Sequence, residues 1–176
     1  GRDWSSDVCS SDLSGQMPLL VQRAFIAAED RRFYQHDGID PVGIGRAMLR
    51  NLKQGSVEEG ASTITQQLAR NAYDLEGERK ERGETGIQRK IVEMFLANRI
   101  EQRYSKREIL EFYLNRIYFG SGYYGIRSAS LGYFGKEPAE LNALESAAIV
   151  GCIKNPANLT PLRHPEDNRK SRNLVI

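Results

Sequence analysis

Apolar residues recur every three to four positions along most of the chain from residue 17 onward, which is the spacing of amphipathic helices. No alternation of apolar and polar residues is long enough to predict a strand. The pattern therefore predicts a mainly α fold. Helices are expected over residues 18 to about 32–35, 41–55, 62–73, 87–103, 105–118, 126–134, 142–153 and from 164 onward.

Short polar signals mark the helix boundaries. Thr63 stands three residues before Gln66, and Ser105 and Asn142 each stand three residues before a glutamate, which is the spacing of a capping box. Pro41 suits the first turn of a helix, and Gly135 suits a helix end. Two helices have a clear apolar stripe: Leu20, Ala24, Ala27 and Ala28 in the first, and Ile87, Ile91, Met94, Phe95 and Ile100 in the 87–103 helix.

Three segments interrupt the helical pattern. Residues 1–14 repeat a Ser-Ser-Asp unit without any period and resemble translated adapter sequence, so we expect a foreign or disordered tail. Residues 74–86 have almost no apolar side chains and predict a mobile, solvated loop. The glycines and tyrosines of 120–125 fit either a tight turn or a wall of the acceptor groove, and the turn is favoured.

Composition and charge narrow the class of protein. The 176 residues are 27% charged and 40% hydrophobic, which predicts one globular domain over 15–176, expected to be truncated at its C-terminus. A net charge of +2 does not indicate a nucleic-acid partner. The longest apolar run, 147–153, is too short to cross a bilayer, and no signal-peptide pattern is visible. Cys152 lies in this run and is expected to be a buried thiol.

Residues 28–38 carry the first candidate chemistry. Carboxylates, arginines, an aromatic pair and a histidine crowd the predicted end of the first helix. A carboxylate at the edge of a core is a candidate acid or base, so Glu29 is the first candidate. His36-Asp37 resembles the metal-binding pair of HD-type phosphohydrolases, but His164 is the only other histidine. A hydrogen bond within the turn is therefore the favoured role for His36.

Two further segments collect polar groups that a core does not need. The start of the 62–73 helix is a natural anion site because of its free backbone N–H groups. It carries Ser62, Thr63, Gln66 and Gln67, with Arg70 one turn further on. Arg89 and Lys90 precede Glu93, and Lys90 and Glu93 share one helix face. Two carboxylates beside a cationic wall fit glycosyl transfer with a phosphate leaving group, although each segment alone also fits a helix cap or a surface ion pair.

The order of these motifs resembles a known family. Glu-Asp-x-x-Phe-x-x-His-x-Gly at 29–38, Gly-x-Ser-Thr-Ile-x-Gln-Gln at 60–67 and Arg-Lys-x-x-Glu at 89–93 are similar to the peptidoglycan glycosyltransferase domain, glycosyltransferase family 51. Segments 109–120 and 144–148 also resemble it, and the similarity covers about 18–176. The family occurs in class A penicillin-binding proteins and in monofunctional transglycosylases.

The resemblance implies a fold and a reaction. The fold would be a lysozyme-like, mainly α globular head with a smaller membrane-facing jaw lobe. Glu29 would take the proton from the acceptor sugar's 4-hydroxyl, which attacks the growing strand with inversion and releases undecaprenyl diphosphate. Glu93 would be the second catalytic acid, associated with the diphosphate or with a divalent metal, Mg²⁺ or Mn²⁺. The implied substrate-binding residues are Asp30, Phe33, Ser62, Thr63, Gln66, Gln67, Arg70, Arg89 and Lys90.

Two of these residues also have simpler roles. Asp30 either supports Glu29 or satisfies the turn, and packing is favoured over substrate contact for Phe33.

The resemblance also implies partners and a location. The implied partners are lipid II, the growing glycan strand and the membrane surface, with a C-terminal transpeptidase domain and a cell-wall synthesis complex as candidates. No organic cofactor and no nucleic acid are expected. The implied location is the outer face of a bacterial cell membrane.

Two other functions stay open. A lysozyme-like lytic enzyme that cleaves glycan strands would also centre on one glutamate. Such a hydrolase has no diphosphate to hold, so the segments at 62–67 and 89–93 argue against it. A non-catalytic module that binds lipid II would share the binding residues and lack the base.

Overall fold

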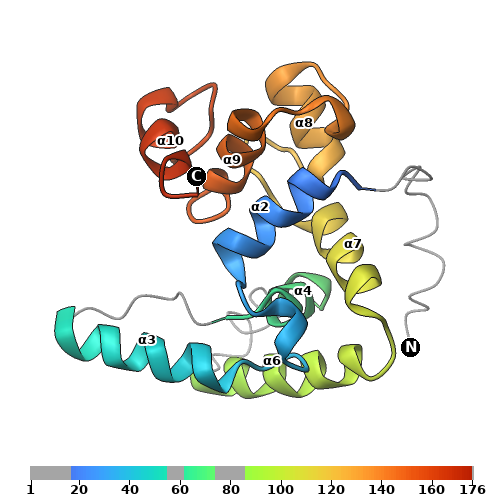
Figure 1. The fold of residues 1–176 in the computed structure, drawn as a ribbon, viewed down its shortest axis with the longest axis vertical. Coiled ribbons are helices and arrows are strands. Elements are labelled where there is room, and N and C mark those ends of the chain that lie inside the picture. The colour runs from blue at the N-terminus through green and yellow to red at the C-terminus, as the bar shows by residue number, and fades with distance from the viewer. Residues whose placement is uncertain (1–16, 55–61, 74–85, 176) are drawn as a thin grey trace. The chain divides into compact units, whose positions relative to one another are not determined.

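The computed structural model describes residues 17–54, 62–73 and 86–175 (Figure 1). Within these ranges the chain forms helices, and its only β pairing is the isolated bridge between Tyr118 and Tyr124. The prediction of a mainly α fold is confirmed. The helices are α2 Leu19–Glu29, η1 Phe33–Gln35, α3 Pro41–Gln54, α4 Ile64–Ala72, α6 Gly86–Glu101, α7 Lys106–Arg116, α8 Ile126–Phe134, η2 Pro138–Glu140, α9 Ala143–Cys152 and α10 Pro165–Arg172.

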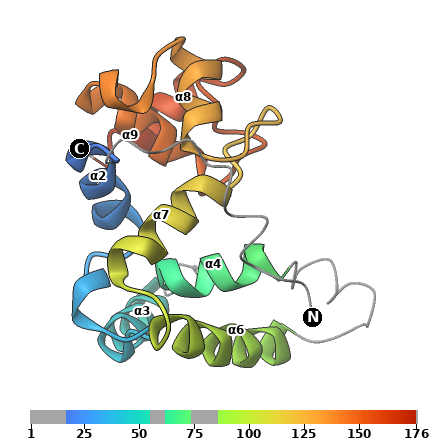
Figure 2. The same ribbon diagram turned by 90° about the vertical axis from the view of Figure 1, so that its right-hand side faces the viewer.

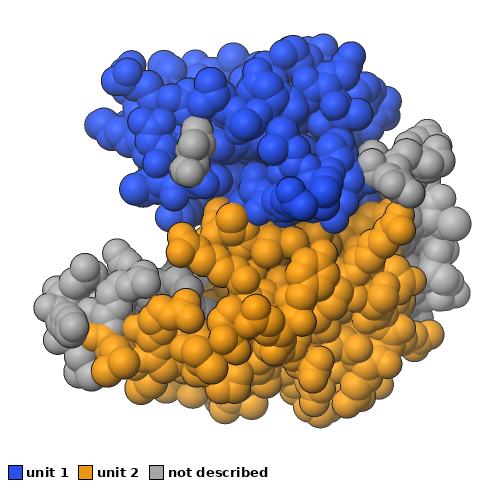
Figure 3. Space-filling model, in the orientation of Figure 1, with its two compact units in different colours: residues 1–24, 114–176 blue, residues 25–113 orange. Residues whose placement is uncertain are grey.

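The chain divides into two compact units (Figure 3). Unit 1 combines Gly1–Ala24 with Leu114–Ile176, and unit 2 is Phe25–Tyr113. The predicted loop at 74–86, apart from Gly86 at the start of α6, lies outside the described residues. So does the predicted tail at 1–14, and its foreign origin stays a prediction.

Unit 2 is built around α4 and α6, which run side by side in both views of the ribbon (Figures 1 and 2). Tyr113 of α7 packs edge-on against Phe25 of α2, with 6.4 Å between the ring centroids. The large buried apolar side chains of this unit are Phe25, Phe33, Ile64, Leu68, Ile109, Leu110 and Tyr113. They hold the ends of α2 and α7 against the start of α4.

Unit 1 is centred on α9, which is buried from Ser146 to Cys152 and packs against α10 and α8. Asn168 of α10 donates hydrogen bonds to the carbonyls of Ala148 and Leu159, at 2.9 and 2.7 Å. Cys152 is fully buried, as predicted, and burial raises the pKa of its thiol to about 12.

Local signals predicted most helix boundaries well. Asn142 and Glu145 form the expected capping box of α9, and Gly135 ends α8 in the left-handed conformation. Two predicted helices end too late. The first ends at Glu29, and the helix expected to reach Tyr118 ends at Arg116 because the chain turns there toward the bridge with Tyr124.

The apolar faces of two helices differ from the simplest reading of their periodicity. In α6, Ile87, Ile91 and Phe95 are exposed, whereas Glu93 and Ala97 are buried. In α2 the buried positions are Val21 and Phe25, and Leu20 of the predicted stripe is exposed. The periodicity of α6 showed that one face is apolar, but it did not show that the opposite face, with Glu93 and Ala97, packs inside.

Gly120 holds the glycine–tyrosine turn, and its replacement by alanine should destabilise the protein. Its φ is +88°, and a Cβ there would overlap the carbonyl oxygen of Pro156 and lie 2.6 Å from the Thr160 methyl group. We expect Gly120→Ala to lower the free energy of unfolding by about 2 kcal/mol or more. Urea denaturation followed by circular dichroism measures the change.

The matched control is Gly45→Ala in α3, where a Cβ would meet nothing within 4 Å. Alanine is favoured over glycine in a helix, so this variant should gain about 0.5–1 kcal/mol. Equal effects of the two substitutions would show that the turn does not require its glycine.

Candidate active site

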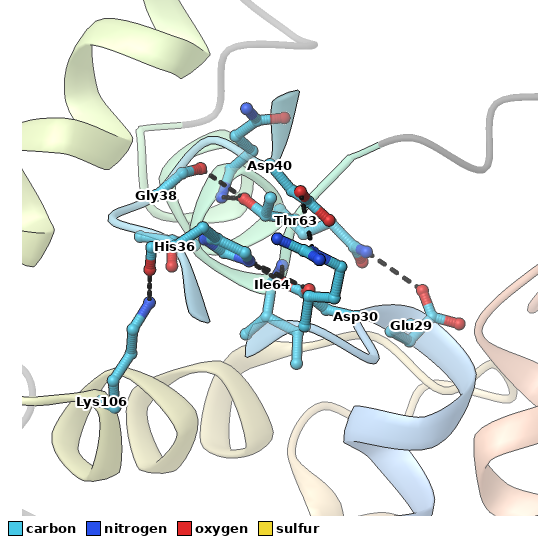
Figure 4. A network of polar contacts seen from close by, with 12 residues as sticks. Glu29, Asp30, His36, Gly38, Asp40, Thr63, Ile64 and Lys106 are labelled. Carbon is cyan, nitrogen blue, oxygen red and sulfur yellow. Dashed lines mark hydrogen bonds and ion pairs between the residues drawn. The ribbon is translucent and has the colours of Figure 1, made fainter. Parts of the chain in front are cut away.

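Asp30 fixes the turn that follows α2. Its carboxylate is buried and accepts hydrogen bonds from His36 Nε2, at 3.0 Å to each oxygen, and from the backbone N–H of Ile64 at 3.1 Å (Figure 4). One side chain therefore joins both ends of the turn to the start of α4. This supports the second of the two roles considered for Asp30, and its burial does not fit direct substrate contact.

Thr63 caps α4 and links it to the same turn. Its hydroxyl oxygen accepts from the Gln66 N–H at 3.2 Å and donates to the Gly38 carbonyl at 2.6 Å (Figure 4). The contact from the Gln66 N–H to the Thr63 hydroxyl is one half of the predicted capping box. The Gln66 side chain instead accepts a hydrogen bond from Lys90 at 2.8 Å.

Lys106 closes the turn from α7. Its ammonium group donates to the His36 carbonyl at 2.5 Å and to Glu101 at 2.7 Å, and lies 4.6 Å from the centroid of the Phe33 ring. Phe33 is fully buried beneath it, so we assign Phe33 to packing rather than to substrate contact. His36 uses Nε2 on Asp30, as expected for a hydrogen bond within the turn.

Glu29, the proposed base, lies at the last residue of α2 and is half-buried. Its Oε2 accepts a hydrogen bond of 3.0 Å from Gln67 Nε2. The two arginines that follow it have other acceptors: Arg31 donates to the Ala27 carbonyl at 3.0 Å, and Arg32 lies 3.3 Å from Asp40. The turn thus presents a carboxylate held by a neutral amide.

Glu93 is the centre of a second cluster and has no exposed surface. Arg70 of α4 donates to both carboxylate oxygens, at 2.7 and 3.2 Å. Arg89 and Lys90 of α6 approach at 3.3 and 3.4 Å. We call Glu93, Arg70, Arg89 and Lys90 the cationic cluster, in which three cations surround one buried carboxylate.

Lys90 connects the cationic cluster to the start of α4. It donates to the Ser62 hydroxyl at 2.7 Å and to Gln66 at 2.8 Å. Burial, together with Arg70 and Arg89, lowers the pKa of Lys90, while Glu93 opposes the shift. The segments at 62–67 and 89–93, separate in sequence, therefore form one site on α4 and α6.

A divalent metal does not fit Glu93 as it stands. Each of its oxygens already accepts from cations. Among the described residues, no three His, Cys, Asp or Glu side chains lie together in a way that could hold a metal ion. We therefore derive no step through Mg²⁺ or Mn²⁺.

Sequence reasoning missed three contributors to the site. Tyr113 donates a hydrogen bond of 3.1 Å to Gln67 Oε1, and Lys106 and Glu101 brace the turn. Thr65 also donates to Glu101, at 2.5 Å. Tyr113 and Lys106 lie in the helix expected over 105–118, and nothing local in the sequence shows that they face α4 and the 30–40 turn.

The fold and the site define a helical domain with an amide-held carboxylate and a cationic cluster. A family model described as transglycosylase matches residues 9–176. The chain belongs to this family, glycosyltransferase family 51, as the motifs predicted.

Three penicillin-binding proteins of similar sequence support the same conclusion. The chain is 48% identical over 161 residues to penicillin-binding protein 1A of Escherichia coli K12, covering 92% of the chain and 18% of the relative. It is 47% identical to penicillin-binding protein 1A of Vibrio cholerae and 42% identical to penicillin-binding protein 1F of Bacillus subtilis, over 92% of the chain and 19% and 22% of those proteins. The chain spans about a fifth of the length of these relatives.

Proposed function

We propose that this chain is a peptidoglycan glycosyltransferase domain that polymerises lipid II into glycan strands. The observation that carries the proposal is the pairing, within unit 2, of a half-buried carboxylate at Glu29 with the cationic cluster around Glu93. The first suits proton abstraction, and the second suits a leaving group that carries negative charge.

In the proposed reaction, Glu29 accepts the proton of the acceptor sugar's 4-hydroxyl. The oxygen attacks the anomeric carbon of the growing strand, the bond to the diphosphate breaks, and the configuration inverts. The positive charges of Arg70, Arg89 and Lys90 stabilise the departing undecaprenyl diphosphate. Glu93 holds these three side chains in place, which is a positioning role rather than that of a second acid.

Incubation of the protein with lipid II tests this proposal. We expect glycan strands, detected as polymer on a gel, together with released undecaprenyl diphosphate. Clearing of preformed peptidoglycan without polymer would instead indicate a lytic enzyme. Binding of lipid II with neither product would indicate a non-catalytic module.

The apolar surface of unit 2 supports a membrane-facing jaw. Met48 and Leu49 of α3 are 63% and 65% exposed, and Ile87, Ile91 and Phe95 of α6 are also exposed. Among the described residues, no helix combines the length and apolar character that crossing a bilayer requires. Apolar residues on helix surfaces bind to the boundary of a bilayer, so we propose that α3 and α6 contact the membrane that carries lipid II.

Vesicle binding tests this surface. We expect the double variant Met48→Gln, Leu49→Gln to bind vesicles of phosphatidylglycerol and phosphatidylethanolamine at least about tenfold more weakly, because two exposed apolar side chains are lost. Co-sedimentation measures the affinity. Leu162→Gln, at a position 62% exposed in unit 1, is the matched control and should bind like the wild type. Equal binding by the double variant would exclude α3 from the contact.

The proposed location is the outer face of a bacterial cell membrane. We also propose a transpeptidase domain and a cell-wall synthesis complex as partners, because the family resemblance implies them.

A further inference from the structure

We propose that Tyr113 is a positioning residue, which orients the Gln67 amide so that its NH₂ group holds Glu29 as a carboxylate. The proposal rests on the function proposed for Glu29. In this arrangement Tyr113 of α7 contacts Gln67 of α4, and Gln67 contacts the proposed base, Glu29 of α2.

The direction of each hydrogen bond follows from chemistry. A carboxylate can only accept, so the Gln67 group 3.0 Å from Glu29 must be the NH₂. The other end of the amide is then an oxygen, which requires a donor. The Tyr113 hydroxyl supplies it at 3.1 Å.

The surroundings of Tyr113 keep its hydroxyl group protonated, so that it can donate a hydrogen bond. Its side chain is 1% exposed and packs edge-on against Phe25. Burial, reinforced by the negative charges of Glu29 and Asp30, raises its pKa well above the usual value, while Arg70 opposes the shift. The hydroxyl therefore keeps its proton throughout the working pH range.

Without the hydroxyl, the Gln67 amide loses one of the two hydrogen bonds that fix its orientation. The flipped amide would point an oxygen at Glu29, and two acceptors repel each other. A charged base needs a fixed donor, because orientation and charge stabilisation both contribute to proton transfer.

Four charged side chains among the described residues near Glu29 make contacts that do not involve the Tyr113 hydroxyl. Arg31 donates to a backbone carbonyl, and Arg32 pairs with Asp40. Asp30 pairs with His36, and Arg70 pairs with Glu93. Removing the Tyr113 hydroxyl therefore leaves these contacts intact.

The first experiment is the pH profile of lipid II polymerisation by Tyr113→Phe. Loss of a donor chain disfavours the carboxylate form, so the acid limb of kcat should move to higher pH by about 0.5–1 unit, with little change in KM. Tyr133→Phe is the matched control, since it also removes a buried tyrosine hydroxyl, which donates to the Phe119 carbonyl at 2.9 Å in unit 1. Its profile should match the wild type, and an unchanged profile for Tyr113→Phe would overturn the proposal.

A double-mutant cycle tests whether Tyr113 acts through Gln67. Gln67→Met keeps the length of the side chain and removes the amide, so it should shift the acid limb in the same direction. Adding Tyr113→Phe to Gln67→Met should then produce no further shift, because the link is already broken. Additive shifts would show that Tyr113 acts by another route.

NMR titration of the Glu29 carboxyl carbon separates this proposal from the proposed function. It requires no turnover, and in Tyr113→Phe the midpoint should lie about 0.5–1 pH unit above that of the wild type. An unchanged midpoint overturns the role of Tyr113. A raised midpoint in a protein that does not polymerise lipid II supports that role and overturns only the proposed function.

Discussion

Replacing Glu29 by glutamine should reduce lipid II polymerisation by about 10²–10⁴-fold, the usual contribution of a general base. The glutamine keeps the shape of the side chain but cannot accept the proton of the acceptor hydroxyl. Initial rates of lipid II consumption, measured at substrate concentrations below and above KM, give the loss in kcat/KM and in kcat.

Asp37→Asn is the matched control for this variant. Asp37 is an exposed carboxylate of the same turn, so the substitution removes the same charge without touching the Glu29–Gln67 contact. We expect it to polymerise lipid II at nearly the wild-type rate. Wild-type activity in Glu29→Gln would show that another group takes the proton.

Lipid II binding by Glu29→Gln gives the second half of this test. Because the cationic cluster is intact in the variant, binding should stay within a few-fold of the wild type. A combined loss of binding and turnover would mean that Glu29 contributes to substrate affinity or to folding.

Local signals in the sequence predicted the helices because caps and breaks are local. Thr63, Asn142 and Gly135 act on backbone groups within four residues of themselves, so their effect could be deduced without a fold. The same reasoning failed for the inner face of α6. Periodicity finds an apolar face, but it assumes that this face packs inside.

The motifs predicted most of the residues that the structure brings together, but not how they are paired. Asp30 reaches the N–H of Ile64, Lys90 reaches Ser62, and Tyr113 reaches Gln67, across 34, 28 and 46 residues of sequence. No local preference determines such pairs, which depend on the packing of α4 against α6 and on the start of α7. The family resemblance implied substrate contact for Asp30 and Phe33, whereas the residues alone favoured packing for Phe33 and left a role in the turn open for Asp30; both side chains are buried.

Glu93→Gln should reveal whether Glu93 supports the cationic cluster or takes part in chemistry. The substitution leaves three cations around a neutral amide in a buried position. Removing one partner of a buried ion pair is strongly destabilising, so we expect the free energy of unfolding to fall by about 3 kcal/mol. Urea denaturation measures this loss: the midpoint should fall, while the dependence of the free energy of unfolding on urea concentration should stay at its wild-type value.

Glu137→Gln is the matched control, because Glu137 pairs with Arg127 at 2.8 Å while both side chains are largely exposed. Water screens exposed ion pairs, so this variant should unfold close to the wild-type midpoint. A similar small effect in Glu93→Gln would show that the cations do not depend on the buried carboxylate. If Glu93→Gln were stable and folded but did not polymerise lipid II, the loss would lie in the reaction itself, and the role of second acid would be restored to Glu93.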